Sequence, residues 1–148
     1  MLRTHNCGEQ NMANVGQRVI LSGWLQRSRD LGGMTFIDLR DRFGLTQLVF
    51  DPNKNPDAHH QAEKLRSEWV ISIKGKVIPR AEGMTNPKLP TGEIEVFVEQ
   101  MEILSKAKTP PFSICDDLID VNEELRLKYR YLDIRRGDVA KKLIIRHK

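Results

Sequence analysis

Phe36 and Gln47 are the side chains of this chain whose types and positions best suit the binding of an unpaired base. Residues 34–41 and 45–50 alternate as strands do, because successive side chains of a strand point to opposite faces. If the two strands pair as a hairpin through 42–44, Phe36 and Gln47 lie on the same solvent-facing surface. An aromatic ring beside an arginine and an amide is a suitable platform for a splayed base. The alternation equally allows a loop or helix to cover Phe36, and the pattern alone leaves both interpretations open.

The sequence shows no catalytic apparatus, so no catalytic residue is assigned. It contains neither a phosphate-binding glycine loop of the P-loop kind nor a GxSxG nucleophile elbow. Cys7 and Cys115 match no metal or redox spacing and are expected to be reduced thiols. His59 and His60 lack the neighbouring ligands of a zinc site, so no metal site is expected. These features favour a binding module over a catalytic domain.

Length and composition indicate a soluble globular protein. The chain has 148 residues, of which 39% are hydrophobic and 30% are charged, as in ordinary globular domains. No apolar run approaches the roughly 20 residues that a membrane-spanning helix needs, and the amino terminus lacks a signal-peptide pattern. A cytoplasmic location is therefore expected.

The distribution of charge argues against a general nucleic-acid coat. Residues 106–148 carry 11 basic and 7 acidic side chains, which supply the whole net charge of +4, whereas residues 1–105 carry 13 of each. Non-specific binding depends on neutralising many phosphates with a basic surface. If residues 1–105 bind nucleic acid, we expect local contacts and shape to dominate over bulk attraction.

Five strand-like runs predict the framework that positions Phe36 and Gln47. The runs are 18–26, 34–41, 45–50, 69–78 and 93–104, with turn residues at Gly32-Gly33 and Phe43-Gly44. Between the third and fourth runs, residues 56–66 predict a short helix with proline in its first turn and with Ala62 and Leu65 facing the core. This is the layout of the OB-fold, a five-stranded Greek-key barrel whose strand 2–3 face binds oligonucleotides. We therefore predict an all-β fold with one minor helix.

The fifth run has the clearest alternation. Ile94, Val96 and Val98 form an inward row, so Glu95 falls on the outward side. A carboxylate there is either part of a solvated face or an acceptor for the amino group of a base. The preceding segment, 80–92, is rich in glycine, proline and asparagine and is either a plain connector or a functional surface loop.

A proline-rich segment predicts the end of the barrel. Pro110 and Pro111 cannot continue a β-ladder. A helix capped by Asn122 is expected next, and another helix from residue 139 onward, after an interruption at Gly137-Asp138. The predicted organisation is a barrel domain over 1–105, a short helical hinge region over 106–137, and the start of a further domain over 138–148.

Five strings of this sequence strongly resemble the amino-terminal region of bacterial-type aspartyl-tRNA synthetases. The strings are RTHNCGE at 3–9, SGWLQRSRDLGGMTFIDLRDRFGLTQLVF at 22–50, NPKLPTGEIEV at 86–96, AKTPPF at 107–112 and EELRLKYRYLDIRR at 123–136. They span nearly the whole chain in order and with family-like spacing. The related synthetases for asparagine and lysine match the linker strings less well.

The resemblance implies an anticodon-binding OB-domain in an enzyme that reads the anticodon of aspartate tRNA. That anticodon is GUC, or QUC when its first base is modified. By position, Phe36 resembles the ring that stacks on the central base, and Gln47 the amide that hydrogen-bonds its edge. Arg29 matches an arginine that contacts the anticodon at the turn between the first two strands. Glu95 resembles the carboxylate near the first base, and Arg80 with its following loop lies near the third.

Specificity for the third base stays open at this level. Leu31 resembles enzymes that serve aspartate tRNA alone, since histidine at that position accompanies relaxed specificity. Ile78, Gly83 and Met84 depart from the commonest family pattern, and they fall near the site that separates aspartate (C) from asparagine (U) anticodons. An enzyme domain that accepts both tRNAs is therefore the alternative within the family.

The family's catalytic motifs, which bind ATP, magnesium and aspartate, would lie beyond Lys148. The resemblance thus implies a fragment of a class II aspartate–tRNA ligase that is inactive alone and holds no cofactor of its own. The parent enzyme would form a homodimer through its catalytic domain. A fragment without that domain could then be a monomer. Two interpretations from other classes remain: a free-standing binder of single-stranded nucleic acid, and a protein-docking module that uses the Phe36 face.

Overall fold

The computed structural model describes residues 3–115 and 120–147 of the chain. The chain divides into two compact units, Met1–Ala107 and Lys108–Lys148. Each unit is described by itself.

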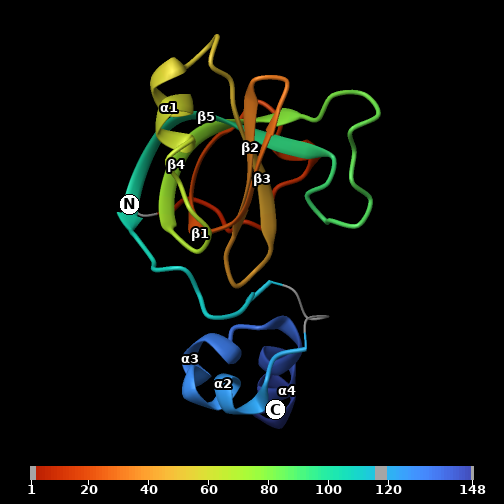
Figure 1. Ribbon diagram of the computed structural model, residues 1–148. Coiled ribbons are helices and arrows are strands. Elements are labelled where there is room, and N and C mark those ends of the chain that lie inside the picture. The colour runs from red at the N-terminus through yellow and green to blue at the C-terminus, as the bar shows by residue number, and fades with distance from the viewer. Residues whose placement is uncertain (1–2, 116–119, 148) are drawn as a thin grey trace. The chain divides into compact units, whose positions relative to one another are not determined.

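The first unit is a closed barrel of five strands (Figure 1). The strands are β1 (Arg18–Leu31), β2 (Met34–Arg40), β3 (Leu45–Phe50), β4 (Val70–Pro79) and β5 (Ile94–Ser105). Their order around the barrel is β1-β2-β3-β5-β4, and β1 closes it by pairing with both β2 and β4. The β3–β5 pair is parallel and the other pairs are antiparallel. The predicted all-β OB-fold is confirmed.

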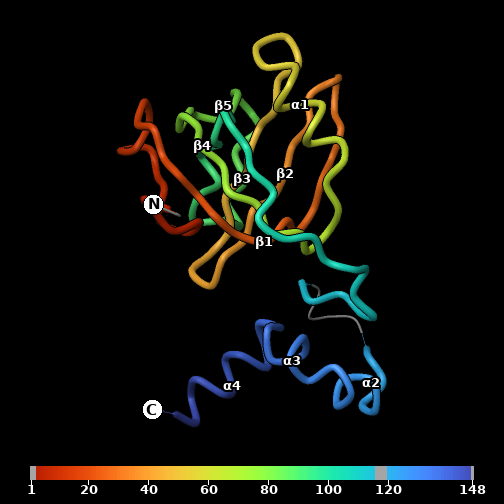
Figure 2. The backbone as a smooth tube through the Cα atoms, turned by 90° about the vertical axis from the view of Figure 1, so that its left-hand side faces the viewer, coloured from red at the N-terminus to blue at the C-terminus, as the bar shows by residue number. Residues whose placement is uncertain are grey.

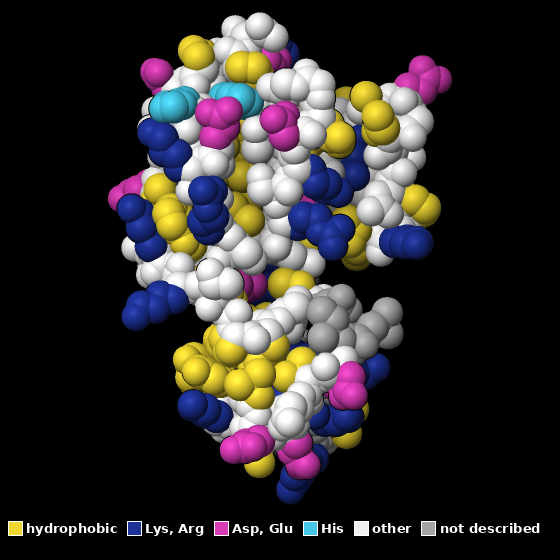
Figure 3. Space-filling view, viewed as in Figure 1, with side chains coloured by type: hydrophobic (Ala, Val, Ile, Leu, Met, Phe, Trp, Pro, Cys, Tyr) yellow, Lys and Arg dark blue, Asp and Glu magenta, His cyan; other side chains and the backbone are white. Residues whose placement is uncertain are grey.

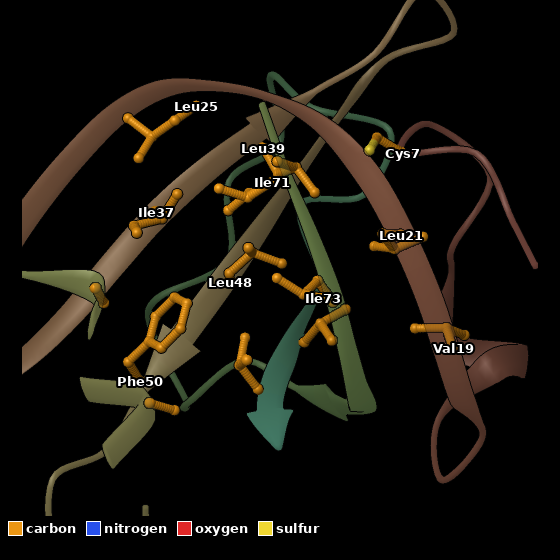
Figure 4. Close-up of a cluster of buried hydrophobic side chains, with 14 of the residues drawn as sticks. Cys7, Val19, Leu21, Leu25, Ile37, Leu39, Leu48, Phe50, Ile71 and Ile73 are labelled. Carbon is orange, nitrogen blue, oxygen red and sulfur yellow. The ribbon is translucent and has the colours of Figure 1, made fainter. Parts of the chain in front are cut away.

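Alternate side chains of every strand fill the barrel (Figure 4). Ile37 and Leu39 of β2 point into the barrel and are fully buried. Phe36 points to the outer side of the same strand and is only half-buried, as the alternation predicts. Burial of such apolar side chains drives folding by roughly 25 cal/mol for each Å² removed from water. The interior of the barrel is therefore a packed core.

Helix α1 (Pro56–Ala62) lies between β3 and β4 in sequence and at one end of the barrel (Figure 2). The Asn55 side chain caps it by accepting a hydrogen bond from the Ala58 backbone N–H at 3.2 Å. Ala62 and Leu65 are buried, as predicted. The predicted length was wrong, because residues 63–65 leave the α-helical pattern, and the Leu65 N–H bonds to the carbonyl three residues earlier.

Strand β1 is five residues longer than the sequence predicts. Residues 27–31 continue the pairing with β2, and Leu31 pairs with Met34 across the turn. Gly32 and Gly33 make that turn with φ of 61° and 80°, conformations that favour glycine. The extension was missed because this end of the hairpin reaches past the core, so most of its side chains are exposed and lack an apolar alternation.

The β2–β3 hairpin is held to the amino-terminal arm by one carboxylate. Asp41 accepts hydrogen bonds from the backbone N–H groups of Phe43 at 2.7 Å, Gly44 at 3.0 Å and Cys7 at 2.9 Å. The arm, which includes the 3₁₀-helix η1 (Met12–Asn14), packs so closely that a Cβ on Gly8 would lie 2.3 Å from the Phe43 carbonyl oxygen. Both cysteines are free thiols, as predicted, and burial with the neighbouring carboxylate raises the pKa of Cys7.

The second unit contains three helices in its described part: α2 (Glu123–Lys128), α3 (Arg130–Asp133) and α4 (Gly137–His147). The Asn122 side chain caps α2 by accepting from the Glu124 N–H at 2.8 Å, as predicted. The expected interruption at 137–138 is wrong, because these residues form the first turn of α4. Asp133 is fully buried and accepts hydrogen bonds from Arg126 at 2.9 Å and Arg130 at 2.7 Å. Across the described residues, no helix is long and apolar enough to span a bilayer.

Candidate nucleic-acid interface

An outward row of polar side chains crosses four strands of the barrel. Arg27 of β1 pairs in register with Asp38 of β2, and Asp38 pairs with Gln47 of β3. Glu95 of β5 continues the row, because its carboxylate accepts a hydrogen bond from the Gln47 amide at 2.8 Å. Residues that lie far apart in the sequence are thus assembled on one exterior surface. We call this surface the recognition face, and it comprises Arg27, Arg29, Phe36, Asp38, Gln47, Arg80 and Glu95.

The Gln47 amide is held at both ends. Its Nε2 donates to Glu95 Oε2 at 2.8 Å, and its Oε1 lies 3.4 Å from the donating Nη2 of Arg29. Arginine can only donate and an ionised carboxylate can only accept, so these partners fix which end of the amide carries the oxygen. One N–H and one lone pair of the amide have no partner among these contacts. The side chain can therefore present a donor beside an acceptor, in one fixed order.

Arg29 and Arg80 add positive charge to that of the exposed Arg27 on this face. Arg29 Nη2 donates to Asp38 Oδ1 at 2.6 Å, and Arg80 Nε donates to the Ile94 carbonyl at 3.0 Å. Arg29 Nε and Arg80 Nη2 are buried, and neither has a hydrogen-bond partner in the described part of the chain. Buried donors are nearly always satisfied in proteins, so two such donors beside one amide indicate a surface suited to an oxygen-rich ligand.

Burial opposes the charges of this face. It raises the pKa of Glu95, although the hydrogen bond from Gln47 and the charge of Arg80 act in the other direction. Burial likewise raises the pKa of Asp38 against the charge of Arg29, and lowers the pKa of Arg80 against the charges of Glu95 and Asp38. The charged forms of these groups therefore reduce the stability of the folded state, which is common where charges serve binding.

Phe36 lies beside this polar row. On β2 it pairs with Arg29 on one side and Val49 on the other, two residues before Asp38 on the same outward face. Its side chain is half-buried, so the ring is neither fully covered nor fully exposed. Leu31 is separate from the hydrogen-bonded group: it ends β1 at the glycine turn and is 60% exposed.

Sequence reasoning assigned no role to Asp38, the residue that anchors Arg29. Asp38 has the same parity as Phe36 on β2, so alternation alone already puts it on the outward face. Arg29 was expected at the turn between the first two strands, but it lies within β1 because that strand extends to Leu31. Arg40 shares the parity of Asp38 and pairs instead with the buried Glu68 at 3.0 Å.

Glu95→Gln is expected to raise the free energy of unfolding at pH 7. The folded state raises the pKa of Glu95 above its ordinary 4.5, so its ionised form is destabilising above the folded pKa. As the pH falls through that value the wild type takes up a proton and gains stability, so the difference between the two proteins should shrink by about pH 4. Urea unfolding at both pH values measures it. The exposed Glu93→Gln is the control, and a less stable Glu95→Gln protein at pH 7 would contradict the expectation.

The charges on the barrel are mixed. On the side shown in Figure 3, Lys and Arg side chains are interspersed with Asp and Glu, and no single sign covers the surface. This agrees with the equal numbers of basic and acidic side chains in residues 1–105. Local pairs such as Arg29 with Asp38 therefore dominate the electrostatics of the recognition face.

Residues 19–104 match the tRNA anti-codon family model, described as an OB-fold nucleic acid binding domain. The chain is 75% identical over 145 residues to a protein of Protochlamydia amoebophila named aspartate–tRNA(Asp/Asn) ligase, covering 98% of this chain and 24% of that protein. The chain therefore spans about a quarter of the length of such curated relatives.

Solved structures share the fold. An asparaginyl-tRNA synthetase from Pyrococcus horikoshii complexed with asparaginyl-adenylate superposes with a TM-score of 0.75 and 29% identity, over 91% of this chain and 29% of that one. An OBody, AM2EP06, bound to hen egg-white lysozyme superposes with a TM-score of 0.61 and 26% identity, over 71% of this chain and 95% of that one.

Proposed function

Since this chain belongs to the family of OB-fold nucleic acid binding domains whose model is named for the tRNA anti-codon, we propose that its barrel reads the anticodon loop of a tRNA. The observation that carries the proposal is the Gln47 amide, held between Arg29 and Glu95 on an outward face beside the Phe36 ring. This arrangement combines an aromatic platform with a polar group of fixed orientation, which are the two elements that recognition of an unstacked base requires.

The held amide favours uracil over cytosine. The pairing edge of uracil offers a carbonyl acceptor beside an N–H donor, which complements one N–H and one oxygen of a primary amide. Cytosine presents an amino donor and a ring acceptor in the opposite order. For a base held in the same orientation, Gln47 could match cytosine only by turning its amide over, which would face its NH₂ toward Arg29 and its oxygen toward Glu95. The central base of the aspartate and asparagine anticodons, GUC and GUU, is uracil.

Phe36 and the two arginines have complementary roles in this proposal. Phe36 stacks on the central base, which gives affinity without choosing the base. Arg29 orients Gln47 and, together with Arg80, offers N–H donors to oxygens of the neighbouring nucleotides. Glu95 accepts a hydrogen bond from an amino group of the first base, guanine. Leu31 adds an exposed apolar contact at the turn.

We further propose that the domain serves an aspartate–tRNA ligase that charges both aspartate and asparagine tRNAs. The support is the 75% identity with a protein named for both tRNAs. In such an enzyme, ATP and magnesium are used by another domain, and the enzyme acts as a cytoplasmic homodimer. This barrel contributes the choice of tRNA. Leu31, which resembles the aspartate-only pattern, then does not exclude asparagine tRNA.

Titrating the whole chain with labelled anticodon stem-loops tests the proposal. At one fixed salt concentration, loops with GUC and GUU are expected to bind with similar affinity, and a GCC loop about 5- to 150-fold more weakly, the value of one good bidentate contact. Tight binding of GUC alone would restrict the domain to aspartate tRNA. Equal affinity for all loops with a steep salt dependence would overturn anticodon reading and favour the general single-strand binder.

A further inference from the structure

A second aromatic side chain outside the recognition face lies in the same row as Phe36. Phe36 of β2 pairs with Val49 of β3, and Val49 pairs with Phe97 of β5. Phe97 points outward, because Val96 and Val98 on either side are fully buried in the core. The outer surface of three adjacent strands therefore carries two rings with a valine between them.

The strip of these three side chains is apolar and partly open. Val49 has outward parity and is nevertheless only 4% exposed, as expected for a small side chain flanked by two larger ones. Phe97 itself is half-buried, like Phe36. The backbone is fixed closely at this point, since a Cβ on Gly75 of β4 would lie 2.3 Å from the Phe97 carbonyl oxygen. The ring thus stands on a firmly held strand.

Charged side chains of both signs lie at the Phe97 end of the strip. Glu95 and Glu99 precede and follow Phe97 on the same outward side of β5, and Glu99 is paired with Arg18 at 3.2 Å. The Lys54 ammonium lies 5.5 Å from the centroid of the Phe97 ring, within the range of a cation–π interaction. Lys76 pairs with Phe97 across the β4–β5 ladder and is exposed. An aromatic ring with one ammonium group beside it and an exposed lysine on the paired strand offers stacking and phosphate neutralisation together, the combination found where proteins hold single strands.

We propose that Phe97, with Lys54, forms a second stacking platform that holds a nucleotide flanking the anticodon, its base on the ring and its phosphate near the lysines. The inference rests on the proposed anticodon function and extends the RNA path from β2 across β3 to β5. Neighbouring strands are about 4.8 Å apart, so Phe36 and Phe97 are separated by roughly 10 Å. Bases on the two rings are therefore splayed apart rather than stacked on each other.

Phe97→Leu is the central variant, because leucine still shields Val49 but cannot stack. Binding of the whole chain to the GUC stem-loop is expected to weaken about 5- to 20-fold, within the range of one lost stacking contact. An abasic site at the nucleotide on one side of the anticodon should weaken wild-type binding similarly and have little further effect on the Phe97→Leu protein. Additive losses for abasic sites on both sides would overturn the proposal.

The lysine is tested against a matched control. Lys54→Met should reduce the dependence of log Kd on log salt by about one unit of slope, as expected for one lost phosphate contact. Lys106→Met is the control, since Lys106 lies 5.2 Å from the Trp69 ring and has the same chemistry outside the strip. Equal slopes for the two variants would count against the phosphate contact.

The two proposals fail in different ways. If the wild type does not distinguish GUC from GCC loops, the proposed function fails. If it does distinguish them and Phe36→Leu weakens binding while Phe97→Leu leaves it unchanged, only the second platform fails. Thermal unfolding of each variant identifies any loss of fold, and a Phe97→Tyr protein, which keeps a stacking ring, is expected to bind within about twofold of the wild type.

Discussion

Replacing Phe36 with alanine is expected to weaken binding of the GUC stem-loop by about 1–3 kcal/mol, the contribution of one base stacked on an aromatic ring. The dissociation constant should rise by about 5- to 150-fold. The loss should be similar for GUC and GCC loops, because stacking provides affinity without reading the base edge. Fluorescence anisotropy of a labelled stem-loop at constant salt measures the change.

A second exposed phenylalanine provides the control for Phe36. Phe43 at the tip of the β2–β3 hairpin is 53% exposed and has the guanidinium groups of Arg3 and Arg42 at 5.7 and 5.5 Å from its ring centroid. Phe43→Ala removes the same side chain from a surface outside the recognition face and is expected to leave loop binding unchanged. If both alanine variants bind as the wild type does, Phe36 does not belong to the site.

Gln47→Glu is expected to weaken the same complex by about 1–3 kcal/mol at neutral pH and to remove most of the preference for a central uracil. The change removes both N–H donors and puts a second carboxylate where Gln47 Nε2 now lies 2.8 Å from Glu95 Oε2. Two carboxylates at such a distance cannot both be ionised at low cost, so the pKa of the pair rises strongly.

The Gln47→Glu protein should therefore show a pH dependence that the wild type lacks. As the pH falls from about 8 to about 5.5 the pair takes up one proton, which restores an O–H donor and part of the affinity. Stem-loop titrations across this range measure the recovery. Gln100→Glu makes the same change at an exposed position of β5 and should bind normally at every pH. A Gln47→Glu protein with wild-type discrimination between uracil and cytosine would refute the assigned role of the amide.

Much of the barrel follows from local patterns. The alternation of Ile37 and Leu39 with Phe36 identified the inner and outer faces of β2, and the glycines at 32 and 33 marked the first turn. These features depend only on residues that are close together in the chain, so they can be predicted from the sequence without a structure. The predicted end of β1 was wrong because its pairing with β2, rather than its side-chain pattern, decides where the strand stops. The predicted length of α1 was wrong because its last residues form hydrogen bonds to the carbonyl three residues earlier, which the apolar pattern does not reveal.

The contacts of Gln47 could not be predicted in the same way. Glu95 is 48 residues away in sequence and reaches Gln47 only because β3 and β5 pair in parallel. Arg29 reaches it through a different strand pair. Parity places each of these side chains on the outer surface, but the register between distant strands decides which of them touch. The assigned roles of Arg29, Leu31, Phe36, Gln47, Arg80 and Glu95 in binding remain predictions.

The parallel pairing of β3 with β5 has a consequence for the nascent chain. The β2–β3 hairpin is complete at Phe50, but the parallel partner of β3 is β5, which ends at Ser105. At about 5–20 residues per second, a ribosome needs roughly 3–11 s to make the chain between these two residues. Through that interval the β2–β3 hairpin has an unpaired edge and an uncovered apolar side, the condition in which strands associate with other chains. The surface proposed to meet tRNA is thus assembled late in synthesis, because Gln47 and Glu95 come together only when β5 joins β3.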